Sequence, residues 1–454
     1  MRPFAPHFSA LLASAALLLT PVTAVRADLV TEWNALALTT MSSSTEAPVM
    51  ARDLAILQAS IFNASESIRG GYNTYGYNAY SAPGAGPAGA DYQAAMISAA
   101  NTVMQSLYSG SSSDFTTLYN TQIGTIAAGQ AKDDGIAWGI TIANEVLSWR
   151  STDGSAAAAS ISYSPVGTVG YWQQTSPSGA LLPGWGNVGT FTIPGAGGYM
   201  TTLPGGSVSN YLLTGQYATD YNQVKDIGAA FSLTRTADQT NQAYFWAGGD
   251  GTVKMTGMWN QIAETVATNA GLSVADTARL LAAVNLAMAD ASIVAMATDY
   301  STQFWRPETA IANGDIDGNG STGVDVSWTP LINSPSLPEY VSLSATISQA
   351  AATVLAAYLG DSVAFSLGSD IDGNGSIDLT RNFTSFSEAA NEAALSGIYG
   401  GTEFGTSVVD GQAIGTQVGN YVVGNNFALV PEPSGALLMM FGAGLFCFGT
   451  RRRR

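Results

Sequence analysis

The sequence predicts an all-α fold: a bundle of roughly ten helices joined by long loops rich in glycine and proline. Apolar residues make up 46% of the 454 residues and charged residues only 11%, so the chain can bury a large core. Apolar positions recur at three- and four-residue steps in most long segments, which is the period of an α-helix. Strand-like alternation is scarce, and fifty glycines indicate many loops between the helices.

The first half of the chain contains three strongly periodic segments, and we expect helices over residues 51–69, 91–107 and 133–150. Four tyrosines follow the first of these and lead into a Pro/Gly/Ala loop: Tyr72, Tyr75, Tyr77 and Tyr80. They are either a platform for a sugar or partner, or loop aromatics packed on the core. Residues 161–208 lack a sustained period and are rich in Gly, Pro and Ser, so we interpret them as a long excursion laid over the bundle.

The second half begins with a helix predicted near residues 258–270. Ser273 and Asp276 form a capping box that starts a helix running to about residue 298. Its apolar residues occupy nearly every side, as expected of a central core helix. Further helices are predicted from Ser342 to about residue 359, from a second box at Ser385 to about residue 397, and over residues 408–421.

The two ends of the chain have the composition of targeting segments. Residues 1–27 combine an early arginine, an apolar run and small residues before Asp28, which predicts a secretory signal peptide. Residues 430–454 hold Val430-Pro-Glu-Pro-Ser434, a short apolar run and four arginines, and resemble the PEP-CTERM sorting signal. The resemblance implies an exported protein, held in the inner membrane by this segment until an exosortase-type protease processes it; the alternative is a simple C-terminal anchor. The domain between them is predicted to cover residues 28–429.

Composition excludes several function classes. Between residues 28 and 430 there are 10 basic and 32 acidic residues, so this part has a net charge of −22 and should repel nucleic acid and anionic lipid. The only histidine is His7 and the only cysteine is Cys447, and both lie in the targeting segments. The processed chain therefore has no Ser-His-Asp or Cys-His catalysis, no zinc site built on His or Cys, and no disulfide.

Several short sequences occur in the same order as in a known group of proteins. They include Phe304-Trp-Arg-Pro307, Pro338-Glu-Tyr-Val-Ser342, Phe383-Thr-Ser-Phe-Ser387 and Ile398-Tyr-Gly-Gly401. Together they resemble the vanadium-dependent haloperoxidases and their relatives, the type 2 phosphatidic acid phosphatases. The resemblance implies a helical bundle and, in one region of it, a site for vanadate or phosphate.

The residues at that implied site have changed. In the family, a lysine and an arginine seven residues apart, a Ser-Gly-His, and an arginine six residues before a histidine surround the oxyanion. Only the arginine of the first pair and the serine are kept. The seven positions are occupied here by Asp299, Arg306, Ser342, Leu343, Ser344, Gly397 and Glu403.

These substitutions change the expected electrostatics of the site. Three fixed positive charges become one, Arg306 against Asp299 and Glu403, a balance of about −1. A multiply charged anion needs several cationic donors, so we expect neither vanadate nor phosphate to bind and predict no cofactor there. Arg306 is expected to form a structural salt bridge with Asp299 or Glu403 and Ser342 to cap a helix; the alternative is that both still bind a ligand.

Two loops match the first half of a calcium-binding loop. Oxygen side chains alternate before a glycine, as a hard cation and a sharp turn require. The stronger candidate ligands are Asp370, Asp372, Asn374, Ser376 and Asp378; the weaker set is Asp315, Asp317 and Asn319. The alternative for both loops is an Asp/Asn/Gly-rich turn without an ion.

The hypothesis that follows is an exported, haloperoxidase-like helical domain that has lost its chemistry and has a binding or structural role at the cell surface or in the matrix. Extracellular polysaccharide is a candidate partner. One alternative is an active haloperoxidase or acid phosphatase with a rearranged site, which would need Ser342 or Ser344 as nucleophile. Another is carboxylate chemistry on glycosides by Asp299 and Glu403, which requires that both face an open cleft.

Overall fold

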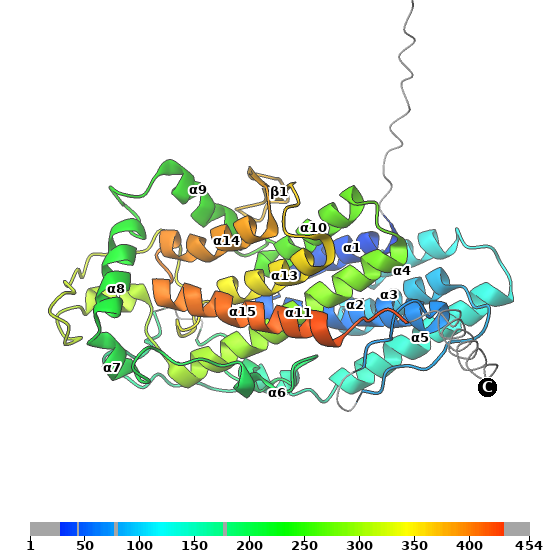
Figure 1. Cartoon of the computed structure of the whole chain (residues 1–454), viewed down its shortest axis with the longest axis horizontal. Helices are drawn as coiled ribbons and strands as arrows, with labels where there is room; N and C mark the ends of the chain where they lie inside the picture. Colours follow the sequence, from blue (N-terminus) through cyan, green and yellow to red (C-terminus); the bar gives the residue numbers. More distant parts are fainter. Residues whose placement is uncertain (1–27, 43–44, 77–79, 176–178, 431–454) are drawn as a thin grey trace, which may run out of the picture.

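The computed structural model describes residues 28–42, 45–76, 80–175 and 179–430. Within them the chain forms an elongated helical bundle (Figure 1). The predicted signal peptide, Tyr77 and the C-terminal sorting segment beyond Val430 lie outside the described residues. The α-helices of the first half are α1 (Leu29–Ser42), α2 (Ala47–Arg69), α3 (Tyr92–Leu107), α4 (Ser112–Ile123), α5 (Gln130–Arg150), α6 (Ser155–Ala158), α7 (Val208–Leu212) and α8 (Gly215–Ile227).

The second half holds the longest helix and a small hairpin. Its elements are α9 (Ala237–Trp246), α10 (Lys254–Asn269), α11 (Val274–Thr302), α12 (Pro307–Ala312), α13 (Leu343–Leu359), β1 (Phe365–Ser369), β2 (Leu379–Phe383), α14 (Phe386–Gly400) and α15 (Gly405–Asn425). Short 3₁₀ turns occur at Ser109–Ser111, Trp185–Asn187 and Ala196–Gly198. The all-α prediction is confirmed.

The sequence patterns missed some of these elements. Helices α1, α4, α8 and α9 were not assigned, because their apolar faces are narrow and interrupted by Thr, Ser, Asn and Gln. The antiparallel pair β1–β2, which joins Phe365 to Phe383 and Ser369 to Leu379, was also missed. Strands of five residues are too short for a period of two to stand out from the background.

Helix α11 is the centre of the bundle, as its composition predicts. Every residue from Leu280 to Met296 is buried, and the helix packs against α2, α10, α13 and α15. Figure 1 shows α11, α13 and α15 running along the long axis, with α8 across one end. Helix α11 is long and apolar enough to span a membrane, yet 94% of its most apolar window is buried inside the protein.

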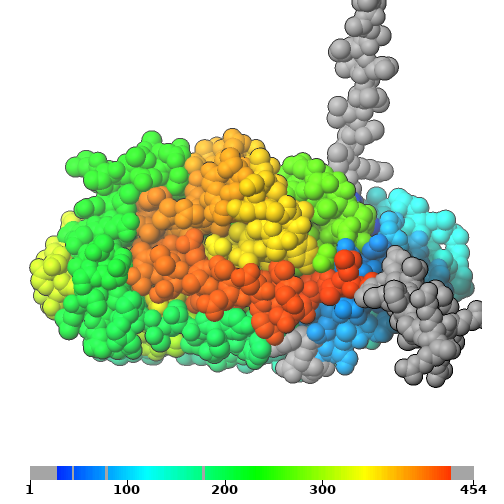
Figure 2. Space-filling model, in the orientation of Figure 1, coloured from blue at the N-terminus to red at the C-terminus, as the bar shows by residue number. Residues whose placement is uncertain are grey.

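Helices α13 and α15 approach each other closely because α15 presents glycines at every fourth position. A Cβ atom at Gly411 would lie 2.8 Å from the Ser342 carbonyl oxygen, and one at Gly415 would lie 2.4 Å from that of Thr346. Any larger residue would therefore push the helices apart. In Figure 2, α14 and α15 form one continuous orange-to-red surface beside the yellow surface of α13.

The excursion over residues 161–208 is packed onto the bundle. Phe191 and Ile193 are fully buried in the main core. The carboxylate of Asp290, in the middle of α11, accepts hydrogen bonds from the backbone N–H groups of Phe191, Thr192 and Ile193 at 2.5, 2.7 and 3.0 Å. This one side chain therefore fixes the excursion to the central helix.

The tyrosines of the first loop are mostly core residues. Tyr75 and Tyr80 are 1% and 6% exposed, and the Tyr72 hydroxyl donates to Asp276 at 2.9 Å. The described tyrosines of this loop therefore pack on the bundle.

Candidate functional site

Arg306 lies where the central helix ends. Helix α11 stops at Thr302, and Gln303 closes it in the left-handed conformation, with φ 59°. Phe304 and Trp305 are buried anchors at 0% and 2% exposure, so the backbone between α11 and α12 is fixed. Arg306 is the residue before Pro307, the first residue of α12, and its side chain points into the protein with 3% of the residue exposed.

The protein itself supplies hydrogen-bond acceptors for nearly all N–H donors of the Arg306 guanidinium. Its Nε donates to the Leu337 carbonyl oxygen and its Nη2 to that of Pro338, both at 2.9 Å. Its Nη1 donates to the Thr402 carbonyl at 3.0 Å and to Glu403 Oε1 at 2.9 Å. Four hydrogen bonds engage a group that has five N–H donors. The predicted salt bridge is therefore present, with Glu403 as the partner.

Glu403 reaches Arg306 because position 397 has no side chain. Helix α14 ends at Gly400, and Gly401 turns the chain in the left-handed conformation, with φ 80°. The chain then folds back so that a Cβ atom at Gly397 would lie only 2.4 Å from Glu403 Cγ. The two substituted positions of the last family motif are thus complementary: the side chain at 403 fills the space that a side chain at 397 would need.

Two more buried carboxyl groups surround the ion pair. Asp299 on α11 and Glu339 are both 0% exposed, and Glu403 is 6% exposed. The Phe404 backbone N–H donates to Glu339 Oε1 at 2.7 Å. Within the described residues, the oxygens of Asp299 and Oε2 of Glu339 and Glu403 make no close hydrogen bond; Asp299 has a weaker contact with the Val341 backbone N–H, and Glu339 and Glu403 have one with each other. Sequence reasoning missed Glu339, although it lies three residues before Ser342.

Burial determines the protonation of these acids. Desolvation raises the pKa of Asp299 well above its usual value, despite the attraction of Arg306. Desolvation followed by the charge of Glu403 does the same for the pKa of Glu339. Burial also raises the pKa of Glu403, but the charge and hydrogen bond of Arg306 oppose it, so Glu403 is the acid that pairs as an anion. The raised pKa values favour the protonated forms of Asp299 and Glu339, which would move the expected charge of about −1 at this place towards zero.

Ser342 lies at the start of helix α13. Ser342 Oγ accepts a hydrogen bond from the Ala345 N–H at 3.2 Å, which confirms the predicted N-cap of α13. Ser342 itself is fully buried, and its hydroxyl lies 3.3 Å from that of Ser344. The side chains at 343 and 344 instead face a cavity. A capping hydroxyl is already committed to the backbone, so Ser342 is poorly placed as a nucleophile.

A cavity of about 220 Å³ remains at this place. Its wall includes five of the seven family positions, which the fold therefore brings together: Arg306, Leu343, Ser344, Gly397 and Glu403. Asp299 and Ser342 lie behind the wall and do not reach the cavity. The rest of the wall is mainly apolar, and its larger members are Leu181, Trp246, Met255, Ile332, Leu337 and Ile347.

This geometry contradicts the glycoside hypothesis. Acid and base must both reach a substrate across one cleft. Asp299 is sealed in the interior, and Glu403 is held in an ion pair. The two carboxyl groups therefore do not face one open site.

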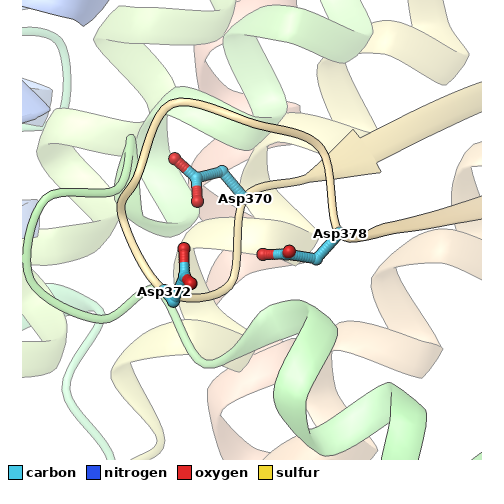
Figure 3. A group of neighbouring side chains, drawn as sticks. All are labelled: Asp370, Asp372 and Asp378. Carbon is cyan, nitrogen blue, oxygen red and sulfur yellow. The ribbon is translucent and has the colours of Figure 1, made fainter.

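The stronger calcium candidate forms a ring of acids between β1 and β2. Asp370, Asp372 and Asp378 each place a carboxylate oxygen within 4.8 Å of the others, and Figure 3 shows all three side chains pointing into the loop. The same oxygens also accept backbone hydrogen bonds, for example from Gly375 to Asp370 and from Ile371 to Asp378, both at 2.8 Å. Of the other two candidate ligands, Asn374 uses Oδ1 to accept a hydrogen bond from the Ser376 backbone N–H at 2.9 Å, and Ser376 is exposed.

The weaker loop is organised by the protein. Asn319 donates its side-chain N–H groups to the carbonyls of Leu212 and Thr214, at 2.7 and 3.0 Å. Asp317 is buried and accepts from Thr322 Oγ1 at 2.7 Å. Asp315 is exposed. These contacts attach the loop to α7 and α8.

Position 397 supplies a stability test. Gly397→Ala should lower the free energy of unfolding by about 1–3 kcal/mol, because the new methyl group collides with Glu403. Gly424→Ala is the matched control: it is also a helical glycine, but no atom lies within 4 Å of the added Cβ, and it should raise stability by about 0.5–1 kcal/mol. Urea unfolding measures both. Equal stability of the Gly397→Ala and native proteins would contradict the packing described here.

The raised pKa values predict that the protein is less stable at alkaline than at mildly acid pH. The folded state keeps the protons of Asp299 and Glu339, and of Glu264, whose pKa burial raises to about 7. The unfolded chain loses these protons near pH 4, so the free energy of unfolding should fall as pH rises from about 4 through 7. Denaturant unfolding at several pH values measures this slope.

Asp299→Asn tests the origin of the slope, because asparagine resembles the protonated acid at every pH. This variant should show a shallower fall in stability over the same range, while Asp315→Asn, at an exposed loop position, should keep the native slope. A slope that is unchanged by Asp299→Asn would assign the pH dependence to other groups.

Comparison with known proteins agrees with this architecture. Residues 279–430 match the family model of the VCPO second helical-bundle domain, and residues 429–454 match the PEP-CTERM protein-sorting motif. No curated protein sequence matches the chain. The crystal structure of the first bacterial vanadium-dependent iodoperoxidase is similar with a TM-score of 0.73 and 22% identity, covering 89% of this chain and 98% of that one.

A bacterial vanadium-dependent chloroperoxidase is also similar. Its holo-type and apo-type crystal structures both give a TM-score of 0.66 at 15% identity; each comparison covers 84% of this chain, and 93% and 94% of the other. At such identities the likeness concerns the fold. The chain is therefore a haloperoxidase-like helical protein that ends in a PEP-CTERM motif, exported and held by a C-terminal membrane anchor before processing.

Proposed function

We propose that this exported protein is a non-catalytic member of the haloperoxidase-like fold and acts in binding or structure at the cell surface or in the matrix. The observation that carries the proposal is the state of Arg306. Its guanidinium N–H groups donate hydrogen bonds to three backbone carbonyls and to Glu403. An incoming oxyanion would find no free cation among the residues that surround this guanidinium.

The donor set does not fit vanadate. A multiply charged anion beside Glu403 is repelled, and at an effective dielectric of about 20 one unit pair at about 4 Å is worth about 4 kcal/mol. To bind to Arg306, the anion would have to displace Glu403 and leave a buried carboxylate unpaired. No imidazole is present in the described residues to bond a metal or attack phosphorus. An active haloperoxidase or phosphatase would therefore need a different set of groups.

Turnover and binding assays test the proposal. The purified chain, residues 28–430, should show no bromide oxidation with vanadate and peroxide, and no hydrolysis of a chromogenic phosphate ester, above a heat-inactivated sample. Vanadate should give no binding heat in titration calorimetry. A bacterial vanadium-dependent chloroperoxidase is the positive control. Saturable turnover by the native chain would overturn the proposal.

Glu403→Gln identifies the cause of anion exclusion. The substitution removes the charge that neutralises Arg306, so vanadate should bind at least about tenfold more tightly than to the native protein. Glu145→Gln makes the same chemical change at an exposed position on α5 and should leave vanadate binding unchanged. Equal, negligible binding by the native and Glu403→Gln proteins would show that this carboxylate does not exclude the anion.

We also propose a structural calcium ion in the loop between β1 and β2. The support is the convergence of Asp370, Asp372 and Asp378 on one point, with oxygen ligands of the type that calcium prefers. Calcium should raise the melting temperature of the native protein, and Asp372→Asn should remove most of this rise. Asp315→Asn, in the other loop, is the control and should respond as the native protein does. Identical responses of the native and Asp372→Asn proteins to calcium would exclude the site.

A further inference from the structure

The cavity beside Arg306 and Glu403 has a wall suited to an apolar molecule. Six of its larger wall residues are apolar: Leu181, Trp246, Met255, Leu337, Leu343 and Ile347. Trp246 supplies an aromatic ring, and Met255 supplies a thioether that makes favourable contacts with aromatic rings. Apolar surface of this kind binds a ligand by removing it from water.

Three of the four charged groups in the cavity wall are paired with the protein, and the fourth, Glu46, is an acid exposed to solvent. Arg306 and Glu403 neutralise each other at its base. Lys254, the other cation in the wall, donates to the Gly249 carbonyl at 2.9 Å and to Asp250 at 3.3 Å. The remaining polar wall groups include the hydroxyls of Ser344, Ser396 and Thr402, which are uncharged. An anion would lose its hydration without gaining a free counter-charge, and a cation would find only the solvent-exposed Glu46, whose attraction water and salt screen. A single hydroxyl, in contrast, could be satisfied by the uncharged polar groups of the wall.

The size of the cavity limits its occupant. An apolar protein cavity of about 150 Å³ is large enough for benzene, which has six non-hydrogen atoms. A volume of about 220 Å³ corresponds in proportion to about nine such atoms. This is the size of one ring with one or two small substituents.

We infer that the cavity binds a small uncharged ring compound of about nine non-hydrogen atoms, with at most one hydroxyl group. The inference rests on the proposed function, because an oxyanion in the same place would restore charge to the site. In this binding role, the apolar wall of the cavity holds the ligand, and the ion pair of Arg306 and Glu403 forms the base of the cavity. Leu343 and Ser344 then form part of the cavity wall that contacts the ligand.

The test uses three ligands that share a fluorinated ring and differ in charge: 4-fluorophenol, 4-fluorobenzoate and 4-fluorobenzylammonium. Near pH 6 the phenol is uncharged. The exported protein should shift and broaden the ¹⁹F resonance of 4-fluorophenol saturably, with a dissociation constant at least about tenfold lower than for either ion. No saturable shift with 4-fluorophenol, or tighter binding of either ion, overturns the inference.

Two variants locate the binding. Ser344→Phe fills the cavity and should abolish the shift, whereas Ala357→Phe adds the same ring at an exposed position of α13 and should leave it unchanged. Leu343→Ala enlarges the cavity and should strengthen the binding of the larger 6-fluoro-2-naphthol relative to the native protein. If Ser344→Phe does not fold, Leu343→Ala decides alone: an unchanged affinity for the naphthol places any binding elsewhere and overturns the inference.

A parallel vanadate titration separates this inference from the proposed function. Vanadate binding by the native protein would refute the proposed function, whatever 4-fluorophenol does. If neither vanadate nor 4-fluorophenol binds, the proposed function stands, and only the inferred ring ligand is refuted. Binding of 4-fluorophenol without vanadate supports both.

Discussion

The buried charge of Arg306 is the constraint on which this region depends. A guanidinium with almost no exposure must be neutralised and hydrogen-bonded, since an unpaired buried ion is strongly destabilising. The protein meets this requirement with the carboxylate of Glu403 and the carbonyls of Leu337, Pro338 and Thr402. Each of these groups lies at or near the end of a helix or in a connecting segment, so the same contacts that neutralise the charge also fix how α11, α13, α14 and α15 meet.

The fold and the chemistry of the site are separable in this protein. The bundle brings the family positions to one place through features remote from any ligand, including the buried length of α11 and the glycines of α15 against α13. Side chains at those positions then decide what the place binds. In this chain Gly397, Glu403, Leu343 and Ser344 occupy four of these positions, and the charge of Glu403 is paired with that of Arg306.

The low polarity around the ion pair also affects the protonation of the neighbouring acids. Asp299 and Glu339 lie beside the ion pair, and desolvation raises the pKa of each acid despite the attraction of the single guanidinium, which favours their protonated forms. This region therefore holds the Arg306–Glu403 ion pair beside two acids whose neutral forms burial favours, while a second buried pair, Arg150–Asp153, lies elsewhere in the described residues.

The sequence alone determined the helical class, the central place of α11, and the caps at Ser273, Ser342 and Ser385, because these depend on local period and capping chemistry. Only the tertiary structure decided that Glu403, and not Asp299, pairs with Arg306, that Glu339 joins them, and that Gly397 makes room for Glu403. The physical reason is that burial and contact between residues far apart in the chain set both the protonation and the reach of these side chains, and no local pattern encodes either.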